Sequence, residues 1–154
     1  MRGFVRTAVP EVLLLKGDRW AQQWVARRER NPNATFTWYQ HENKSAREWL
    51  LPLLRDMTDG HCSFCDSFPL EGQSNEPIEH FRPKSNFPCL AFEWGNLYYC
   101  CEKCQTSKQE EWSEELLAPD PNLSAWINRD ASVPNSSIPD VVPFFGCPRS
   151  YWLH

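Results

Sequence analysis

Two segments in the amino-terminal third show the hydrophobic spacing of amphipathic helices. The first spans Asp18–Arg30, where Trp20, Trp24 and Val25 fall on one side of a helix. Its first residue is an aspartate, which can cap a helix start, and the Asn–Pro pair that ends at Pro32 is typical of a helix stop. This pattern predicts a helix over the whole segment.

The second amphipathic segment spans Ser45–Thr58. Ser45 and Glu48 have the spacing of a capping box, and Gly60 is a plausible stop after the last turn. Pro52 lies inside the segment, so the helix must either kink or begin later. The core-facing positions share the helical period and are Leu50, Leu51, Leu54 and Met57.

The middle of the chain has short apolar runs between turn residues, which predicts small β elements. Glu76–Arg82 reads as a strand, Asn86–Phe92 as a turn with a short return strand, and Gly95–Tyr99 as one helical turn or a strand. Cys104–Leu117 is rich in helix formers. The last segment, 119–154, holds six prolines and is expected to be irregular.

The composition is that of a globular domain: 41% of the 154 residues are hydrophobic and 23% are charged. The sequence has no apolar run long enough to cross a membrane. The apolar stretch near the start is short and broken by Pro10 and Glu11, so no signal peptide is predicted and the expected location is the cytoplasm. Seven cysteines without a secretion signal favour a metal site or free thiols over a disulfide framework.

Charge is distributed unevenly around the net value of -4. Residues 1–60 carry ten Lys and Arg against seven Asp and Glu, and they are the one net basic third of the chain. Arg27, Arg28 and Arg30 cluster there. The cluster is either a solvated helix face, which is the commoner case, or a patch that contacts phosphate groups.

Two CxxC pairs, Cys62–Cys65 and Cys101–Cys104, predict a structural zinc ion. Each pair can aim two sulfur atoms at one metal, and two pairs complete a tetrahedral thiolate shell, so the bound ion would have no open position for catalysis. A thioredoxin-like redox pair is disfavoured because it would occur once, between a strand and a helix.

The neighbouring cysteines leave one ambiguity. Cys100 adjoins Cys101 and could replace it as a ligand, although the two-residue spacing favours Cys101. Cys89 and Cys147 are expected to be unliganded thiols. The segment between the two pairs is longer than in a simple zinc ribbon and can hold a hairpin. The zinc would then clamp the ends of a small ββα unit.

The segment between the cysteine pairs carries a combined motif. "IEHFRPKS" is followed by "WGNLYYCCEKCQTSK", and the whole set resembles the zinc-containing HNH endonuclease pattern from Cys62 to Lys108. More narrowly, it resembles the HNH subunit of Septu-type and retron-associated anti-phage systems. The resemblance implies that such a subunit acts beside an ATPase subunit.

The resemblance also implies roles for particular residues. His80 would be the general base, Asn96 would hold the His80 ring or its backbone, and Glu79 would bind a catalytic Mg²⁺ or Mn²⁺ ion. The position after the second CxxC is usually His or Asn in the family and completes that metal site. Here it is Gln105, whose amide lies one methylene further from the backbone. Three candidates for phosphate contacts are Arg82, Lys84 and Lys108.

The sequence thus predicts an α+β fold with a zinc-clamped ββα-metal (HNH, His-Me finger) core. The expected parts are a helical extension over 1–60, the HNH unit over 61–118 and a Pro-rich tail over 119–154, with no indication of oligomeric state. The expected function is metal-dependent cleavage of DNA phosphodiester bonds in anti-phage defence, controlled by a partner ATPase. The alternative is a catalytically degenerate, zinc-stabilised subunit that docks on a partner protein.

Overall fold

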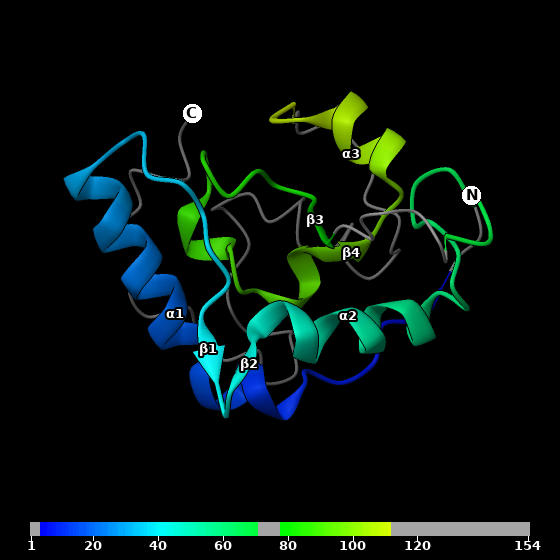
Figure 1. Ribbon diagram of the computed structural model, residues 1–154, viewed down its shortest axis with the longest axis horizontal. Coiled ribbons are helices and arrows are strands. Elements are labelled where there is room, and N and C mark those ends of the chain that lie inside the picture. The colour runs from blue at the N-terminus through cyan, green and yellow to red at the C-terminus, as the bar shows by residue number, and fades with distance from the viewer. Residues whose placement is uncertain (1–3, 71–77, 112–154) are drawn as a thin grey trace, which may run out of the picture.

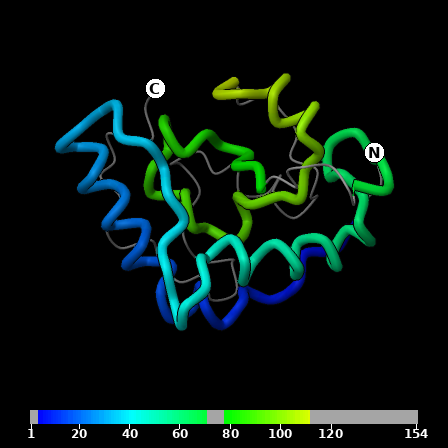
Figure 2. Tube along the Cα trace, viewed as in Figure 1, coloured from blue at the N-terminus to red at the C-terminus, as the bar shows by residue number. Residues whose placement is uncertain are grey.

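The computed structural model describes residues 4–70 and 78–111, which form a mixed α and β structure (Figures 1 and 2). The helices are α1 (Glu11–Arg30), α2 (Ala46–Met57) and α3 (Glu102–Lys108). The strands are β1 (Gln40–His41), β2 (Lys44–Ser45), β3 (Ile78–His80) and β4 (Leu97–Tyr99). The expected α+β class is confirmed. Among the described residues, none of the helices is both long and apolar enough to cross a membrane.

Helix α1 begins before the expected start at Asp18. Pro10 precedes its first residue, and Val12 and Leu13 are buried together with Trp20 and Trp24. The apolar stripe therefore extends toward the amino terminus, and Asp18 lies exposed in the helix interior instead of capping it. The stop at the Asn–Pro pair is confirmed, because the helix ends at Arg30.

Helix α2 has the capping box that its sequence predicted. The Ser45 side chain accepts a hydrogen bond from the Glu48 amide, and the Glu48 carboxylate accepts one from the Ser45 amide at 2.7 Å. Pro52 lies inside the helix on its exposed side. Gly60 has a φ of 74° and donates its amide to the Arg55 carbonyl, which closes the last turn.

A tight hairpin that the sequence pattern did not reveal joins the two long helices. Strands β1 and β2 pair antiparallel, and the two residues between them, Glu42 and Asn43, both have positive φ angles of 48° and 61°. Such angles at both central positions favour the right-handed twist of a two-residue hairpin. The hairpin turns the chain directly into the cap of α2.

Strands β3 and β4 form the second antiparallel hairpin, in which Glu79 lies opposite Tyr98 and His80 opposite Leu97. Strand β3 falls within the predicted segment Glu76–Arg82. The predicted return strand over Asn86–Phe92 is wrong: that segment contains a 3₁₀ turn at Pro88–Leu90. Proline has no amide to donate to a strand ladder, which favours the turn.

The return strand β4 lies in the segment for which the sequence left two readings open. Residues Trp94–Asn96 form one 3₁₀ turn and Leu97–Tyr99 form the strand, so both readings hold in part. Helix α3 begins at Glu102, two positions ahead of the expected start at Cys104, and ends at Lys108. The rest of the predicted helix past residue 111 and the Pro-rich tail lie outside the described residues.

One apolar cluster joins the amino-terminal helices to the second hairpin. Trp24 of α1, Leu50 and Leu54 of α2, and Leu97 and Tyr99 of β4 are all at most 2% exposed and belong to it. In Figure 1 the two long helices lie along two sides of the hairpin and α3 lies beyond it. The helices therefore support the strands from which the candidate site is built.

Ser45 and Asp18 are the two helix caps that the sequence predicts, and replacing them should affect stability differently. We expect Ser45→Ala to lower the free energy of unfolding by about 1 kcal/mol because it removes a formed capping box. We expect Asp18→Ala to change it by less than about 0.5 kcal/mol because Asp18 is exposed inside α1. Urea unfolding of the two variants measures both values, and a larger loss for Asp18→Ala would contradict the start of α1 at Glu11.

Candidate metal centre and active site

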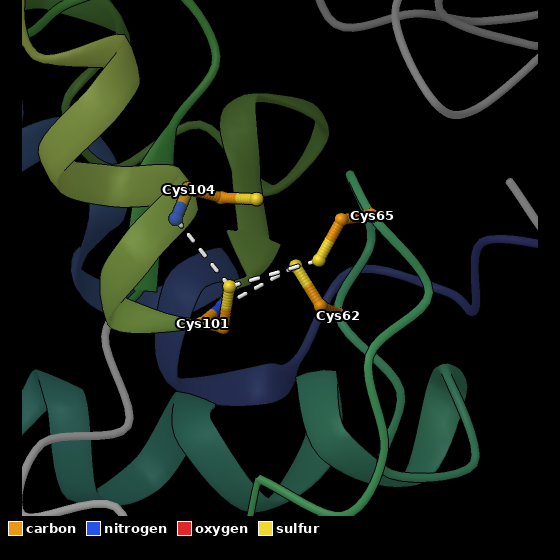
Figure 3. A group of neighbouring side chains, drawn as sticks. All are labelled: Cys62, Cys65, Cys101 and Cys104. Atoms are coloured by element: carbon orange, nitrogen blue, oxygen red, sulfur yellow. Dashed lines mark hydrogen bonds between the residues drawn. The ribbon is translucent and has the colours of Figure 1, made fainter.

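Four cysteine thiols meet at one point of the fold. The sulfur atoms of Cys62, Cys65, Cys101 and Cys104 all lie within 4.8 Å of one another. Figure 3 shows the two cysteines of the turn after α2 facing the two at the start of α3. The Sγ atoms of Cys65 and Cys101 are 3.7 Å apart, close to the ~3.8 Å edge of a tetrahedron with zinc–sulfur bonds of about 2.3 Å. The donor set therefore fits a zinc ion.

Backbone hydrogen bonds hold the two cysteine turns in this arrangement. The Cys101 amide donates to Cys62 Sγ at 3.3 Å, and the Cys104 amide donates to Cys101 Sγ at 3.4 Å. The Ser63 amide donates to the Tyr99 carbonyl at 2.9 Å, which fixes the first turn to the end of β4. Amide donors to sulfur favour the thiolate form that a metal requires.

The thiols of the cluster differ in acidity. Burial, followed by contacts with the Cys65 and Cys101 thiols, raises the pKa of Cys104, and burial raises the pKa of Cys101, whereas a hydrogen bond with the Cys100 thiol lowers the pKa of Cys62 to about 4. Several thiolates so close together repel one another, and a divalent cation removes that repulsion. The cluster can thus hold zinc with all four ligands from the chain, which leaves no open coordination position.

The other cysteines are now placed. Cys100 is fully buried and its thiol donates to the Cys101 carbonyl at 3.2 Å, so Cys101 and not Cys100 belongs to the cluster. The expectation of a free thiol at Cys89 is wrong, because Cys89 is disulfide-bonded. Whether a cysteine forms a disulfide depends on its distance from another cysteine in the folded chain, and spacing in the sequence does not give that distance. Cys147 lies outside the described residues.

Glu79 and Lys108 form a buried ion pair at one side of β3. Lys108 Nζ lies 2.9 Å from Glu79 Oε1 and 3.0 Å from the His80 carbonyl oxygen, to which it donates. The side chains are only 9% (Glu79) and 13% (Lys108) exposed. Burial raises the pKa of Glu79, while hydrogen bonding and the charge of Lys108, and hydrogen bonding from Gln105, oppose that shift. Gln105 and Lys108 of α3 therefore both lie at the Glu79 carboxylate.

The His80 ring makes contacts with other residues than Glu79 does. Its Nε2 atom is 3.0 Å from the Ala91 carbonyl oxygen, which can only accept, so the proton is on Nε2 and the lone pair is on Nδ1. Trp38 stacks on the ring at 5.7 Å and Phe36 meets it edge-on at 5.4 Å. Burial, together with the charge of Lys84, lowers the pKa of His80 to about 3, so the ring is neutral at pH 7.

Asn96 connects the two ends of the loop between β3 and β4. Its side-chain oxygen accepts from the Arg82 amide at 2.7 Å, and its side-chain nitrogen donates to the Arg82 and Leu90 carbonyls, both at 3.0 Å. Arg82 lies two residues after His80, and Leu90 directly precedes the Ala91 carbonyl that His80 contacts. Asn96 does not bond the His80 ring but fixes the backbone on both sides of it.

The remaining candidates lie around the same loop. The Arg82 guanidinium is 5.5 Å from the centre of the Phe87 ring, and the Lys84 ammonium is 5.4 Å from that of Phe36. The structure therefore gathers Glu79, Gln105 and Lys108 at one place and sets the His80 ring beside Lys84 and the aromatic pair.

Sequence reasoning missed the two aromatic residues that cover His80. Phe36 and Trp38 lie more than forty positions before His80 in the chain, so no motif connects them. Their alternation in an extended, half-buried segment was the one available signal of a packed face. The role of Ala91 could not be found at all, because its backbone carbonyl makes the contact.

Comparison with known proteins gives two partial matches. The chain is 33% identical over 73 residues to "Septu protein PtuB" of Bacillus mycoides (strain KBAB4), which covers 39% of this chain and 24% of that protein. It is 29% identical over 68 residues to "Septu protein PtuB" of Bacillus thuringiensis, covering 43% of this chain and 26% of that protein. The chain thus spans about a quarter of the length of these relatives. The family models and the solved structures gave no match.

The adjacent cysteines at the second pair should behave differently when replaced. We expect Cys101→Ser to lose bound zinc and most of the thermal stability, because zinc binding contributes to folding when four ligands come from the chain. Cys100→Ser is the matched control and should keep about one zinc per chain, since a hydroxyl can still donate to the Cys101 carbonyl. Mass spectrometry of the native proteins measures zinc content, and equal zinc in both variants would contradict the cluster.

Proposed function

We propose that this chain is an HNH-type endonuclease that hydrolyses DNA phosphodiester bonds as part of an anti-phage defence system. The observation that carries the proposal is the position of Glu79 and His80 at the end of β3. There they lie beside a helix, α3, that the four-thiol cluster attaches to the strand hairpin. The partial similarity to Septu proteins supports the same assignment.

His80 would act as the general base. Its ring is neutral at pH 7 and the Ala91 carbonyl holds the proton on Nε2, which leaves the lone pair of Nδ1 to take a proton from an attacking water. The pKa of about 3 lies well below the value that suits a base at pH 7, so binding of substrate would have to raise it. The hydrogen bond fixes both the tautomer and the direction of the ring, as catalysis by an imidazole requires. Asn96 would support this geometry through the backbone of Arg82 and Leu90.

Glu79 and Gln105 would hold a catalytic Mg²⁺ or Mn²⁺ ion. Both offer oxygen atoms, which hard divalent ions prefer, and the buried Glu79 carboxylate pairs with Lys108 and feels the charge of Lys84. Mg²⁺ commonly uses one or two protein ligands and takes the rest from water and phosphate, so this small donor set fits. Such an ion would stabilise negative charge on the phosphate and on the leaving 3′-oxygen.

Basic side chains next to the site would contact the phosphate backbone. Lys108 already lies at the Glu79 carboxylate and Lys84 lies over the aromatic pair, while Arg82 follows β3 directly. A net charge of -4 gives the whole chain little general attraction for nucleic acid. The proposal therefore includes a partner, of the ATPase type that the resemblance implies, which brings the substrate to this site.

A second function is favoured by the burial of the same residues. His80 is 3% exposed and Glu79 is 7% exposed, and Lys108 already neutralises the carboxylate. A zinc-stabilised subunit that docks on a partner protein and has no catalysis of its own would keep such a closed arrangement. Loss of divalent-ion binding at Glu79, with zinc retained, would be its signature.

Cleavage of supercoiled plasmid by the zinc-loaded chain tests the proposal. We expect nicking that requires Mg²⁺ or Mn²⁺ and falls at least ~100-fold in His80→Ala, the low end of what a general base contributes. Asn86→Ala, an exposed position in the same loop, is the matched control and should cut like the native chain. Equal cutting by the native chain and His80→Ala would overturn the role of His80. If the chain is inactive with and without its partner, the docking function replaces the nuclease.

A further inference from the structure

A group of positive charges lies along one edge of the molecule and extends from the candidate site to the end of α1. It consists of Arg27, Arg28 and Arg30 in the last turn of α1 and Lys84 in the loop after β3, and is called the basic edge below. The sequence left open whether the three arginines are a solvated helix face or a patch that contacts phosphate.

Two contacts bring the helix and the loop together. Arg28 Nη2 donates to the Ser85 carbonyl at 3.3 Å, and Trp24 Nε1 donates to the Lys84 carbonyl at 3.1 Å. In Figure 1 the carboxyl-terminal end of α1 lies at the left, and the light-blue segment that follows it runs between α1 and the green loop after β3. The arginines of α1 and Lys84 therefore form one surface although they are far apart in sequence.

Lys84 connects the basic edge to the candidate active site. Its ammonium lies 5.4 Å from the centre of the Phe36 ring, and that ring lies 5.4 Å from the ring of His80. After burial, the charge of Lys84 is the largest influence that lowers the pKa of His80. The edge thus begins beside His80 and runs toward the end of α1.

The basic edge keeps an excess of positive charge: Glu29 lies within the arginine run and the Glu110 carboxylate accepts a hydrogen bond from the Ser85 hydroxyl, but none of the ion pairs found within residues 4–70 and 78–111 includes an arginine of the edge. Arg27 donates to the Thr37 hydroxyl and Arg30 to the Ala26 carbonyl, both on the exposed surface. The helix dipole also favours cations at this end of α1, so the three arginines stabilise the helix end as well as making this surface positive.

We propose that the basic edge binds the phosphate backbone of a nucleic acid and directs the strand toward His80. The proposal rests on the nuclease function proposed above and assigns the substrate path to that site. A surface with an excess of positive charge complements the regular negative charges of a nucleic-acid backbone. A local surface of this kind allows a chain with a net charge of -4 to bind a polyanion.

Salt-dependent binding of a labelled DNA duplex tests the basic edge. The native chain, Arg27→Gln/Arg30→Gln and Lys16→Gln/Arg19→Gln are compared by fluorescence anisotropy without divalent ions, so that no cutting occurs. The control pair lies in the amino-terminal half of the same helix and removes the same charge. Arg28 is left in place because its guanidinium donates hydrogen bonds to the Pro32 and Ser85 carbonyls, so its replacement could change the structure.

The expected result is a change in the salt slope that is specific to the edge. In a plot of the logarithm of the binding constant against the logarithm of the salt concentration, loss of two phosphate contacts should lower the magnitude of the slope by about 1.8. Binding should weaken roughly tenfold or more at physiological salt, while the control pair keeps the native slope. Equal losses in both pairs, no salt-dependent binding by the native chain, or competition by polyglutamate as strong as by DNA would each overturn the proposal.

Failure of this inference is distinguishable from failure of the nuclease. If the plasmid is cut through His80 but both variant pairs bind alike, the nuclease stands and the basic edge does not. If the edge variants alone lose the salt slope and the plasmid is never cut, the basic edge stands as a nucleic-acid contact and the catalytic assignment fails.

Discussion

The four thiols that meet within 4.8 Å fix how the turn after α2, the end of β4 and the start of α3 come together. Strands β3 and β4 pair over only three residues each, which is too short for a hairpin to be stable alone. Helix α3 has seven residues, none of which is fully buried, so it too needs external support. A zinc ion, which the four clustered thiols could hold, would supply that support at the junction of both elements.

The candidate site depends on this junction. Glu79 comes from β3 while Gln105 and Lys108 come from α3, so their contact exists only if helix and hairpin are attached. His80 depends in addition on the loop that Asn96 ties and on the aromatic pair from the segment after α1. The segment between α1 and β1 therefore does more than connect two elements, because its Phe36 and Trp38 side chains cover the His80 ring and contribute to the burial that lowers its pKa.

Local patterns in the sequence predicted local structure well. Spacing alone predicted two features correctly. These are the Ser45–Glu48 capping box and the cluster of the two CxxC pairs, Cys62–Cys65 and Cys101–Cys104. The start of α1 was not predicted correctly, since Asp18 matched a cap while the buried Val12 and Leu13 decided the outcome. The strand at Asn86–Phe92 failed because apolar content does not distinguish a buried 3₁₀ turn from a strand.

The relations that decide the chemistry lie between distant parts of the chain. No local rule connects Phe36 or Trp38 with His80, or α1 with the loop that holds Lys84. The sequence did place Glu79 and His80 side by side on a strand, and in the structure the two side chains make different contacts, as neighbours on a strand do. What covers each side chain, and so what its pKa is, required the tertiary structure.

Amide hydrogen exchange of the chain with and without zinc tests the central claim, that the thiol cluster holds the candidate site together. The amides of β3 and β4 and those of α3 are followed while zinc is removed by a chelator and then restored. The account predicts that protection in all three elements is lost together without zinc and returns with it. Protection of β3 and β4 that stays unchanged in the zinc-free chain would show that the core of α1 and α2 alone holds the strands, and would contradict the account.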